Sequence, residues 1–164
     1  MKSGSAIPDN DQAGETIRLD QMLCFALYGA AHAFSRAYKP LLEPLGLTYP
    51  QYLVMISLWE KDGQPVKGLG EALGLDSGTL SPLLKRLEQA GLVTRTRARS
   101  DERQVNITLT QKGRALEADA AGVTSAIAGA TGCGLDEIVS LRDRLQDLRL
   151  RLVEAGERLD SAPA

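Results

Sequence analysis

The segment 66–109 most constrains the fold of this chain, because it has the patterns of two short helices and two short strands with little between them. Apolar residues recur at helical spacing on both sides of a break at Gly74-Leu75. Asp76 or Ser77 can cap the second helix, since short polar side chains accept hydrogen bonds from the free N–H groups of a helix start. Two helices joined by so short a turn predict a helix-turn-helix.

Two segments with alternating apolar and polar residues follow the second helix, at residues 92–97 and 104–109. In the latter, Val105, Ile107 and Leu109 fall on one face, which is typical of a half-buried strand. The polar residues between the two segments complete a β-hairpin with a charged tip. We therefore expect a mainly α fold with a small β-hairpin wing, which is a winged helix-turn-helix.

Helical patterns flank this module on both sides. Before it, small and apolar residues recur at spacings of three and four: Leu19, Leu23, Ala26, Ala30, Ala33 and Ala37. After it, a leucine-rich seam keeps a similar rhythm: Ile138, Leu141, Leu145, Leu148, Leu152 and Leu159. Such seams are typical of helices that pack along a long partner helix.

Prolines mark the expected interruptions. Pro40 and Pro44 are expected to break the first helix into short pieces, because proline lacks an N–H and crowds the preceding turn. A new helix is expected to start after Thr48, with Pro50 in its first turn. Pro82 has two interpretations: it can open a helix that starts later, or be absorbed near the start of the second helix of the helix-turn-helix.

Charge is distributed unevenly along the chain. The formal net charge is −2, which by itself does not indicate a nucleic-acid partner. Residues 67–114 nevertheless hold nine Lys and Arg against five Asp and Glu, whereas residues 1–66 sum to −2 and residues 115–164 to −4. A basic centre between acidic flanks is typical of a DNA-binding module carried on acidic dimer arms.

The basic centre supplies the candidate DNA contacts. A recognition helix lies in the major groove, where its first polar residues meet base edges and phosphates: Asp76, Ser77, Thr79 and Ser81. Lys85 and Arg86 lie farther along this helix, where phosphate contact is expected. At the hairpin tip, Arg99 and Arg103 suit a narrow minor groove, and Asp101 can hold the Arg103 side chain in place. The alternative is a set of solvated surface charges, but the order of helix-turn-helix and wing favours double-stranded DNA, bound at a pseudo-palindromic operator by a two-fold dimer.

Cysteine is scarce: Cys24 and Cys133 are too few for a disulfide scaffold in 164 residues. Residues 1–13 are polar, with no apolar signal core, and no apolar run approaches the ~20 residues of a membrane span. We therefore expect a cytoplasmic protein with no membrane partner, whose thiols stay reduced unless an oxidant acts on them. Cys24 lies among Leu, Met and Phe, where a thiol is commonly an inert core residue, but Tyr28 follows one turn later on the same helix face.

Several motifs together resemble the MarR family of winged-helix repressors. The hairpin segment 92–110 is similar to the wing signature of that family. The segment 75–88, Leu-Asp-Ser-Gly-Thr-Leu-Ser-Pro-Leu-Leu-Lys-Arg-Leu-Glu, resembles the recognition helix of its organic-hydroperoxide-sensing branch, OhrR. The segments 23–28, 38–42 and 48–53, which hold Cys24 and four tyrosines, match the same branch.

The resemblance implies a dimeric organisation. Residues 17–164 would form a single MarR-like domain, in which 48–109 is the winged helix-turn-helix. The dimerisation helices would lie in 17–47 and 110–160, which agrees with the alanine and leucine seams. Residues 1–16, rich in Ser, Gly, Asp and Asn, are expected to be a flexible tail.

The resemblance also implies a redox sensor. Cys24 would react with an organic hydroperoxide to form a sulfenic acid, and the protein would then leave its operator. In OhrR proteins two tyrosines of the partner subunit hydrogen-bond the sensing cysteine, and by motif these match Tyr38 and Tyr49; Tyr28 matches a further pocket tyrosine. In the two-cysteine forms the second thiol bridges to the sensing cysteine of the other subunit. Cys133, at a glycine-rich break, stands where that thiol is expected.

Three alternatives stay open. A regulator of the same fold could respond to an apolar or phenolic ligand without redox chemistry. Cys24 could be the catalytic thiol of a peroxidase, but nothing in the sequence indicates a site for docking a reductant, so we expect no enzyme activity. A pure dimerisation module would leave the basic hairpin unexplained. The sequence predicts no metal and no other cofactor.

Overall fold

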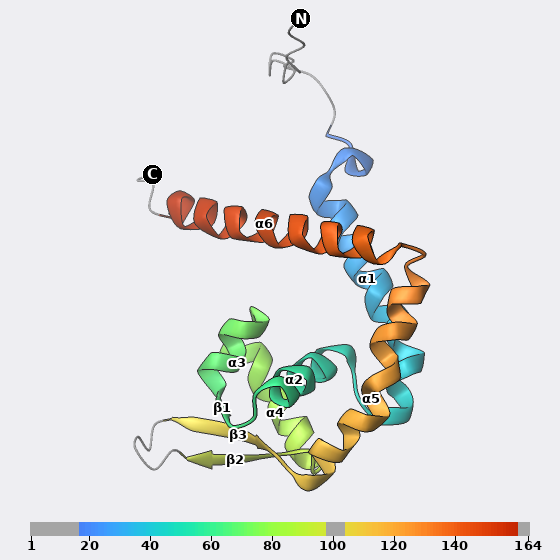
Figure 1. Cartoon of the computed structure of the whole chain (residues 1–164). Helices are drawn as coiled ribbons and strands as arrows, with labels where there is room; N and C mark the ends of the chain where they lie inside the picture. Colours follow the sequence, from blue (N-terminus) through green and yellow to red (C-terminus); the bar gives the residue numbers. More distant parts are fainter. Residues whose placement is uncertain (1–16, 98–103, 161–164) are drawn as a thin grey trace, which may run out of the picture. The chain divides into compact units, whose positions relative to one another are not determined.

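The computed structural model describes residues 17–97 and 104–160. The chain separates into two compact units, Met1–Phe34 and Ser35–Ala164. Along the chain the order is a 3-10 helix, helix α1, a second 3-10 helix, helix α2, strand β1, helices α3 and α4, strands β2 and β3, and helices α5 and α6 (Figure 1). Helix α1 (Leu23–Leu42) belongs to both units, because the boundary falls inside it.

The first unit exposes most of its described side chains. A 3-10 helix at Leu19–Gln21 precedes α1, and the Met22 N–H closes it by donating to the Leu19 carbonyl at 3.2 Å. Arg18 and Asp20 form an exposed ion pair of 2.8 Å beside it. The exposed large hydrophobic side chains of this unit are Ile17, Leu19, Met22, Leu23, Phe25, Tyr28 and Phe34. Of these, Leu19 and Leu23 belong to the predicted dimerisation seam.

Helix α2 (Tyr49–Glu60) starts where the sequence predicts. Thr48 and Gln51 form a capping box: the Thr48 N–H donates to the Gln51 side chain at 2.9 Å, and the Gln51 N–H donates to the Thr48 hydroxyl at 3.5 Å. Pro50 stands in the first turn, where its missing N–H removes no helical hydrogen bond. The two reciprocal bonds fix the point at which the chain enters the helix.

Helices α3 (Val66–Leu73) and α4 (Ser77–Gln89) form the predicted helix-turn-helix. Gly74 ends α3 with a φ of +65°, a left-handed conformation that glycine adopts without steric cost, and Asp76 caps α4. One face of α4 packs into a core with side chains of α2 and α3: Val54, Met55, Leu58, Leu69, Leu80, Leu84 and Leu87. Because this face points inwards, the polar face of α4 points to solvent.

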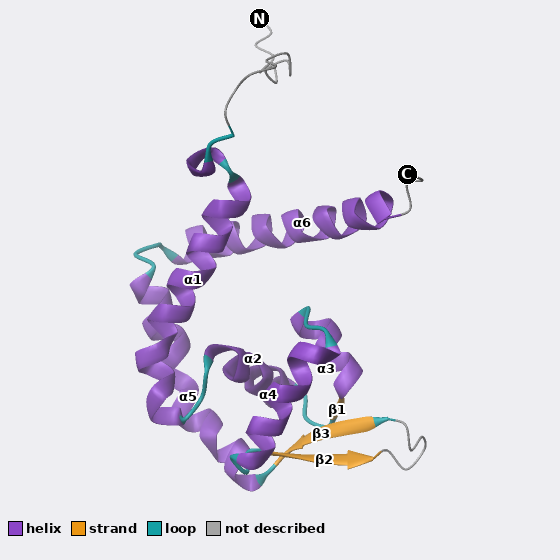
Figure 2. Ribbon diagram, turned by 180° about the vertical axis from the view of Figure 1, so that it is seen from behind, coloured by secondary structure: helices purple, strands orange, loops and turns teal. Residues whose placement is uncertain are grey.

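Strands β2 (Val93–Arg97) and β3 (Val105–Leu109) form the predicted antiparallel hairpin, with Arg95 opposite the fully buried Ile107. The sequence did not predict a third strand, β1 (Gln64–Pro65), which pairs with the other edge of β3. The strand order is therefore β1-β3-β2 (Figure 2). Two residues, one of them proline, carry too short a pattern to indicate a strand.

The expectation that Pro40 breaks the first helix is wrong. Helix α1 continues through Pro40 to Leu42, and Pro44 then lies in the 3-10 helix Glu43–Leu45. A proline this close to a helix end disturbs only the last turn, so the helix can contain it and end soon afterwards. Pro82 lies in the second turn of α4, which agrees with the interpretation that the helix absorbs it near its start.

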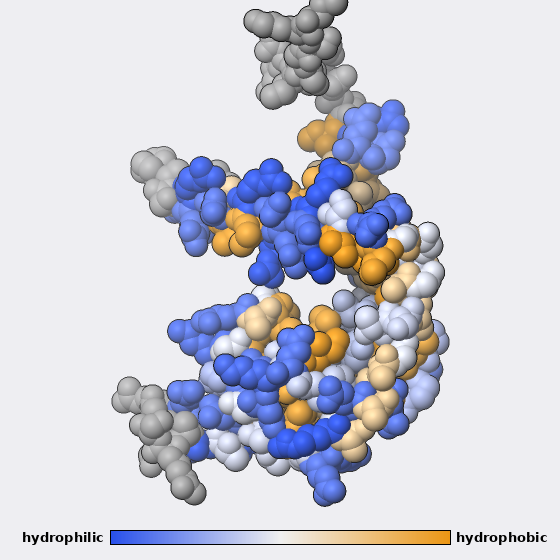
Figure 3. Space-filling view, viewed as in Figure 1, coloured by the Kyte–Doolittle hydropathy of each residue, from blue (hydrophilic) through white to orange (hydrophobic). Residues whose placement is uncertain are grey.

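Helices α5 (Gln111–Ala130) and α6 (Leu135–Asp160) complete the described chain. Thr110 caps α5, because its hydroxyl accepts a hydrogen bond from the Gly113 N–H at 3.0 Å. Helix α6 exposes large apolar side chains, some of which are visible as orange patches in Figure 3: Leu135, Val139, Leu141, Leu145, Leu150, Leu152 and Val153. Within the described residues, no helix combines the length and apolar character needed to cross a bilayer.

Candidate nucleic-acid interface and thiol site

The start of α4 presents four of the predicted DNA-contacting side chains to solvent: Asp76, Ser77, Thr79 and Ser81. Asp76 accepts two hydrogen bonds from Thr79, one from its backbone N–H at 2.8 Å and one from its hydroxyl at 3.1 Å. These bonds, the backbone one first, lower the pKa of the Asp76 carboxyl. The carboxylate therefore orients the Thr79 side chain and caps the helix whose tip the sequence assigns to the major groove.

Lys85 and Arg86 follow on the exposed side of α4, in agreement with their predicted place beyond the helix tip. The three predicted wing-tip residues, Arg99, Asp101 and Arg103, lie outside the described residues. Their role in DNA binding stays a prediction.

Arg95 is a functional candidate that the sequence analysis did not single out. Its guanidinium donates to the Ser81 carbonyl at 3.2 Å and forms an ion pair with Glu88 at 3.4 Å. Strand β2 is thereby tied to the recognition helix at two points. The sequence could not indicate that Arg95 ties β2 to α4, because these contacts form only when the strand lies against that helix.

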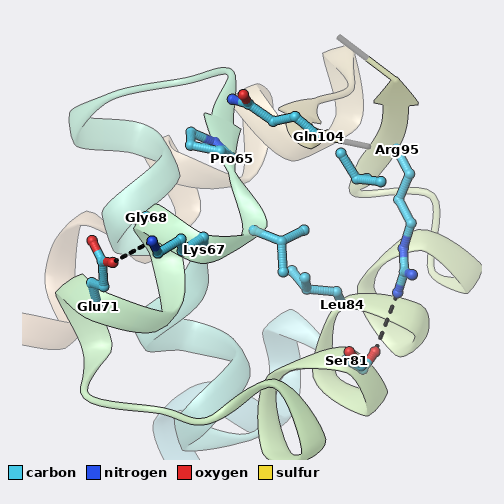
Figure 4. Close-up of a pocket in the computed structure, with 10 residues that line it drawn as sticks. Pro65, Lys67, Gly68, Glu71, Ser81, Leu84, Arg95 and Gln104 are labelled. Carbon is cyan, nitrogen blue, oxygen red and sulfur yellow. Dashed lines mark hydrogen bonds and ion pairs between the residues drawn. The ribbon is translucent and has the colours of Figure 1, made fainter. Parts of the chain in front are cut away.

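An open pocket of about 640 Å³ lies between α3, α4 and the sheet (Figure 4). Its lining combines apolar and polar side chains: Pro65, Val66, Lys67, Glu71, Ser81, Leu84, Arg95, Gln104 and Val105, together with Gly68. Lys67 pairs with Glu71 at 3.8 Å on one side, and Arg95 bonds to Ser81 on the other. The pocket thus offers an apolar surface between two cationic side chains.

The structure brings two predicted sensor tyrosines together. The Tyr38 and Tyr49 rings stack with their centroids 4.5 Å apart. Burial raises the pKa of both hydroxyls, and the neighbouring Tyr49 and Tyr52 raise the pKa of Tyr38 further. Both hydroxyls therefore stay protonated at neutral pH, as a hydrogen-bond donor to an anion must.

Cys24 is exposed at the second position of α1, so it is not a core residue of its own chain. Tyr28 follows one turn later, as predicted, and its ring contacts His32 edge-on with the centroids 4.3 Å apart. His32 follows Tyr28 by one more turn, so Cys24, Tyr28 and His32 stand at intervals of four residues along α1.

Cys133 lies in the predicted break between α5 and α6, directly after Gly132, which has a φ of +69°. The thiol is partly buried. The Cys133 N–H donates to the Thr131 hydroxyl at 3.2 Å, and its thiol donates to the Thr131 carbonyl at 3.7 Å. Cys133 thus sits in a tight turn that keeps its sulfur partly accessible. Within the described residues, no group of three or more His, Cys, Asp and Glu could hold a metal ion.

Comparison with known proteins defines the class. Residues 36–119 match the family model of the transcriptional regulator SarA/Rot. The chain is 56% identical over 131 residues to the HTH-type transcriptional regulator TtmR of Methylorubrum extorquens, covering 80% of this chain and 67% of TtmR. It is 44% identical over 132 residues to the organic hydroperoxide resistance transcriptional regulator of Bacillus subtilis, covering 80% and 90%.

A solved relative is AbfR of Staphylococcus epidermidis. Reduced AbfR bound to DNA matches with a TM-score of 0.69 at 38% identity, over 82% of this chain and 94% of AbfR. Disulfide-formed AbfR matches with a TM-score of 0.57 at 40% identity, over 79% and 91%. Fold and matches together define a DNA-binding winged-helix transcription regulator. This chain belongs to the MarR-like SarA/Rot family of regulators and is of the OhrR type.

Proposed function

We propose that this chain forms a homodimeric repressor that senses organic hydroperoxides through Cys24 and then releases its operator. The observation that carries the proposal is the stacked, half-buried pair of Tyr38 and Tyr49, whose protonated hydroxyls can donate to a thiolate. The sensor site would combine Cys24 of one protomer with these two tyrosines of the other. The relative from Bacillus subtilis is named for organic hydroperoxide resistance, which supports this choice of oxidant.

The proposed chemistry begins with the thiolate of Cys24. It attacks the O–O bond of the hydroperoxide, an S–O bond forms, and the departing alkoxide takes up a proton to become an alcohol. Cys24 is oxidised to a sulfenic acid while the peroxide is reduced. The thiolate of Cys133 in the partner protomer then attacks that sulfur, so that an S–S bond forms and hydroxide leaves as water. The relative AbfR has been solved both reduced and with a disulfide formed.

The apolar surface of the terminal helices supports a dimer. Helix α6 exposes Leu141, Leu145 and Leu152 of its predicted seam, and α1 exposes Leu23 of its own. Burying these seams against a second copy would remove that surface from water. A two-fold dimer would also present two α4 helices to the half-sites of one operator, so oxidation that moves the protomers would weaken DNA binding.

The direct test is operator binding by the purified reduced protein, before and after addition of cumene hydroperoxide. The operator is a duplex selected by this protein from a random-sequence pool. We expect wild type to lose affinity on oxidation, and Cys24→Ser to bind equally well and to keep its DNA. Release by Cys24→Ser equal to that of wild type would remove the redox model.

Cys133→Ser separates the two chemical steps. We expect this variant to form the sulfenic acid, detected by dimedone labelling, but to give no covalent dimer on a non-reducing gel. A covalent dimer that persists in Cys133→Ser would rule out the bridge between Cys24 and Cys133.

The pocket between α3, α4 and the sheet favours a second candidate function. Its apolar lining between Lys67 and Arg95 suits a phenolic acid, bound without redox chemistry. Operator binding by Cys24→Ser in the presence of 4-hydroxybenzoate tests it. A fall in affinity that Arg95→Gln abolishes would support a ligand-responsive regulator, and unchanged affinity would exclude this ligand class.

A further inference from the structure

A row of aromatic rings leads away from the sensor tyrosines along α2. Tyr38, stacked on Tyr49, also contacts Tyr52 with the ring centroids 5.8 Å apart. Tyr52, only 2% exposed, in turn contacts Trp59 nearly edge-on at 6.2 Å. Tyr52 and Trp59 are seven residues apart and therefore share one face of the helix. The row extends from the first residue of α2 to its penultimate one, and all four rings belong to the unit Ser35–Ala164.

The far end of the row is bonded to the root of the wing. The Trp59 indole N–H donates to the Gly113 carbonyl at 2.9 Å. Gly113 lies in the first turn of α5, shortly after β3 ends, and is packed against the backbone, because a Cβ there would collide with the Leu92 carbonyl oxygen. Gly113 cannot move without moving the strand-to-helix connections around it.

Asp62 strengthens the same junction. Its carboxylate accepts hydrogen bonds from the N–H groups of Gly63 and Leu109, each at 2.8 Å, and forms an ion pair of 2.8 Å with Arg114. Leu109 is the last residue of β3, and Arg114 is in the first turn of α5. The end of α2 is therefore hydrogen-bonded to both sides of the connection from β3 to α5.

We propose that Trp59 is a positioning residue, which transmits a displacement of the Tyr38 and Tyr49 rings to the wing. This inference rests on the proposed function, because oxidation of Cys24 is the event that removes the thiolate from Tyr38 and Tyr49. Rings that shift in a closely packed row displace their neighbours. The rigid indole carries that displacement to the Gly113 carbonyl, and from there it reaches β3 and the DNA-facing wing.

Trp59→Phe tests the proposal, because it keeps an aromatic ring in the row but removes the N–H. We expect reduced Trp59→Phe to bind the operator within about fivefold of wild type, the size of one neutral hydrogen bond. Cumene hydroperoxide should lower operator affinity about 100-fold in wild type, within the usual range of allosteric coupling, and less than about tenfold in the variant. Dimedone labelling of Cys24 should be equal in both. Full release by Trp59→Phe would overturn the proposal.

Gln64→Met is the matched control. The Gln64 amide donates to the Ser57 and Lys61 carbonyls, so it also stabilises the end of α2, but it is not part of the aromatic row. We expect Gln64→Met to release DNA as wild type does. If Gln64→Met also released less DNA than wild type, then any weakening of the α2 end would reduce release, and Trp59 would have no specific role.

Two measurements keep the proposal testable if the variant folds poorly or if peroxide has no effect. Trp59 is the only tryptophan, so its emission in wild type reports on the junction directly. Emission should change together with DNA release; release without a change in emission would overturn the proposal.

A double-mutant cycle of Tyr38→Leu and Trp59→Phe, measured on the operator Kd of the reduced protein, needs no oxidant. We expect the two effects to deviate from additivity by at least about threefold, and strict additivity would contradict the coupling. A wild type that keeps its DNA under peroxide would defeat only the proposed function.

Discussion

The winged helix-turn-helix of residues 48–109, here called the reading domain, and the terminal helices α1 and α6 differ in how completely one chain buries their apolar side chains. In residues 48–109, the core side chains Leu58 and Ile107 have no exposed surface. In α6, by contrast, Leu141 is 51% exposed and Leu152 is 60% exposed. Burial of apolar surface contributes about 25 cal/mol per Å². One chain can therefore stabilise its own reading domain, whereas the terminal helices gain this stabilisation only by covering their seams.

This difference assigns separate tasks to the two regions. In the proposed dimer, the winged helix of each chain would recognise a half-site, and the contacts between protomers would determine whether two half-sites are engaged together. A sensor that acts on those contacts can change operator affinity without unfolding the part that reads DNA.

The strongest test of this comparison places a charge in the α6 seam. Leu141→Asp should dissociate the dimer, because an unpaired buried carboxylate costs several kcal/mol and two-fold symmetry introduces it twice. Sedimentation velocity should show a monomer, while the near-UV circular dichroism of Trp59 in the reading domain stays native. Gln146→Asp adds the same charge at an exposed position of α6 and should remain dimeric. Simultaneous loss of the dimer and of the Trp59 signal would show that the reading domain also depends on the partner.

A smaller effect is expected from a cavity in the reading domain. Leu58→Ala should lower the free energy of unfolding by about 2–5 kcal/mol, because it removes a fully buried side chain from a packed core. Urea denaturation followed by Trp59 fluorescence measures it. Lys61→Ala, exposed just after the same helix, is the control. A loss below about 1 kcal/mol for Leu58→Ala would mean that the core collapses around the gap.

Helix starts and turns could be predicted from the sequence because they depend on local signals. Gly74 and Asp76 marked the turn of the helix-turn-helix, and Thr48 marked the start of α2. The strand β1 and the passage of α1 through Pro40 were missed, because pairing with β3 and helix continuation near an end depend on tertiary context rather than on local preference.

The candidate site was predictable only in part. Motifs indicated Tyr38 and Tyr49, and the structure stacks their rings. No motif indicated Trp59, Asp62 or Arg95, because each acts through a partner distant in sequence. Their roles become visible only when α2 meets α5 and when β2 meets α4.

A third prediction concerns the entry into the reading domain. Thr48→Val removes the hydroxyl that accepts from the Gln51 N–H and should lower the free energy of unfolding by about 1 kcal/mol, typical of a lost helix cap. Thermal unfolding by circular dichroism measures it. Thr48→Ser keeps the hydroxyl and should recover most of the loss; a Ser variant as unstable as the Val variant would assign the effect to packing of the methyl group instead.

The smallest effect is expected at high pH, at the tyrosine pair that joins the end of α1 to the start of α2. Burial raises the pKa of Tyr38 above its ordinary value, so the folded chain holds this proton more tightly than the unfolded chain does. The corresponding stabilisation is complete below about pH 10, the unfolded pKa, and is lost as the pH rises through the folded pKa. Wild type should therefore lose stability more steeply above about pH 10 than Tyr38→Phe, which has no phenol to ionise. Urea denaturation across this range measures the slope, and Tyr49→Phe should flatten it in the same sense, because burial also raises the pKa of Tyr49. Equal slopes in wild type and both variants would show that the hydroxyls are as well solvated in the folded protein as in the unfolded chain, which would contradict the burial of the tyrosine pair.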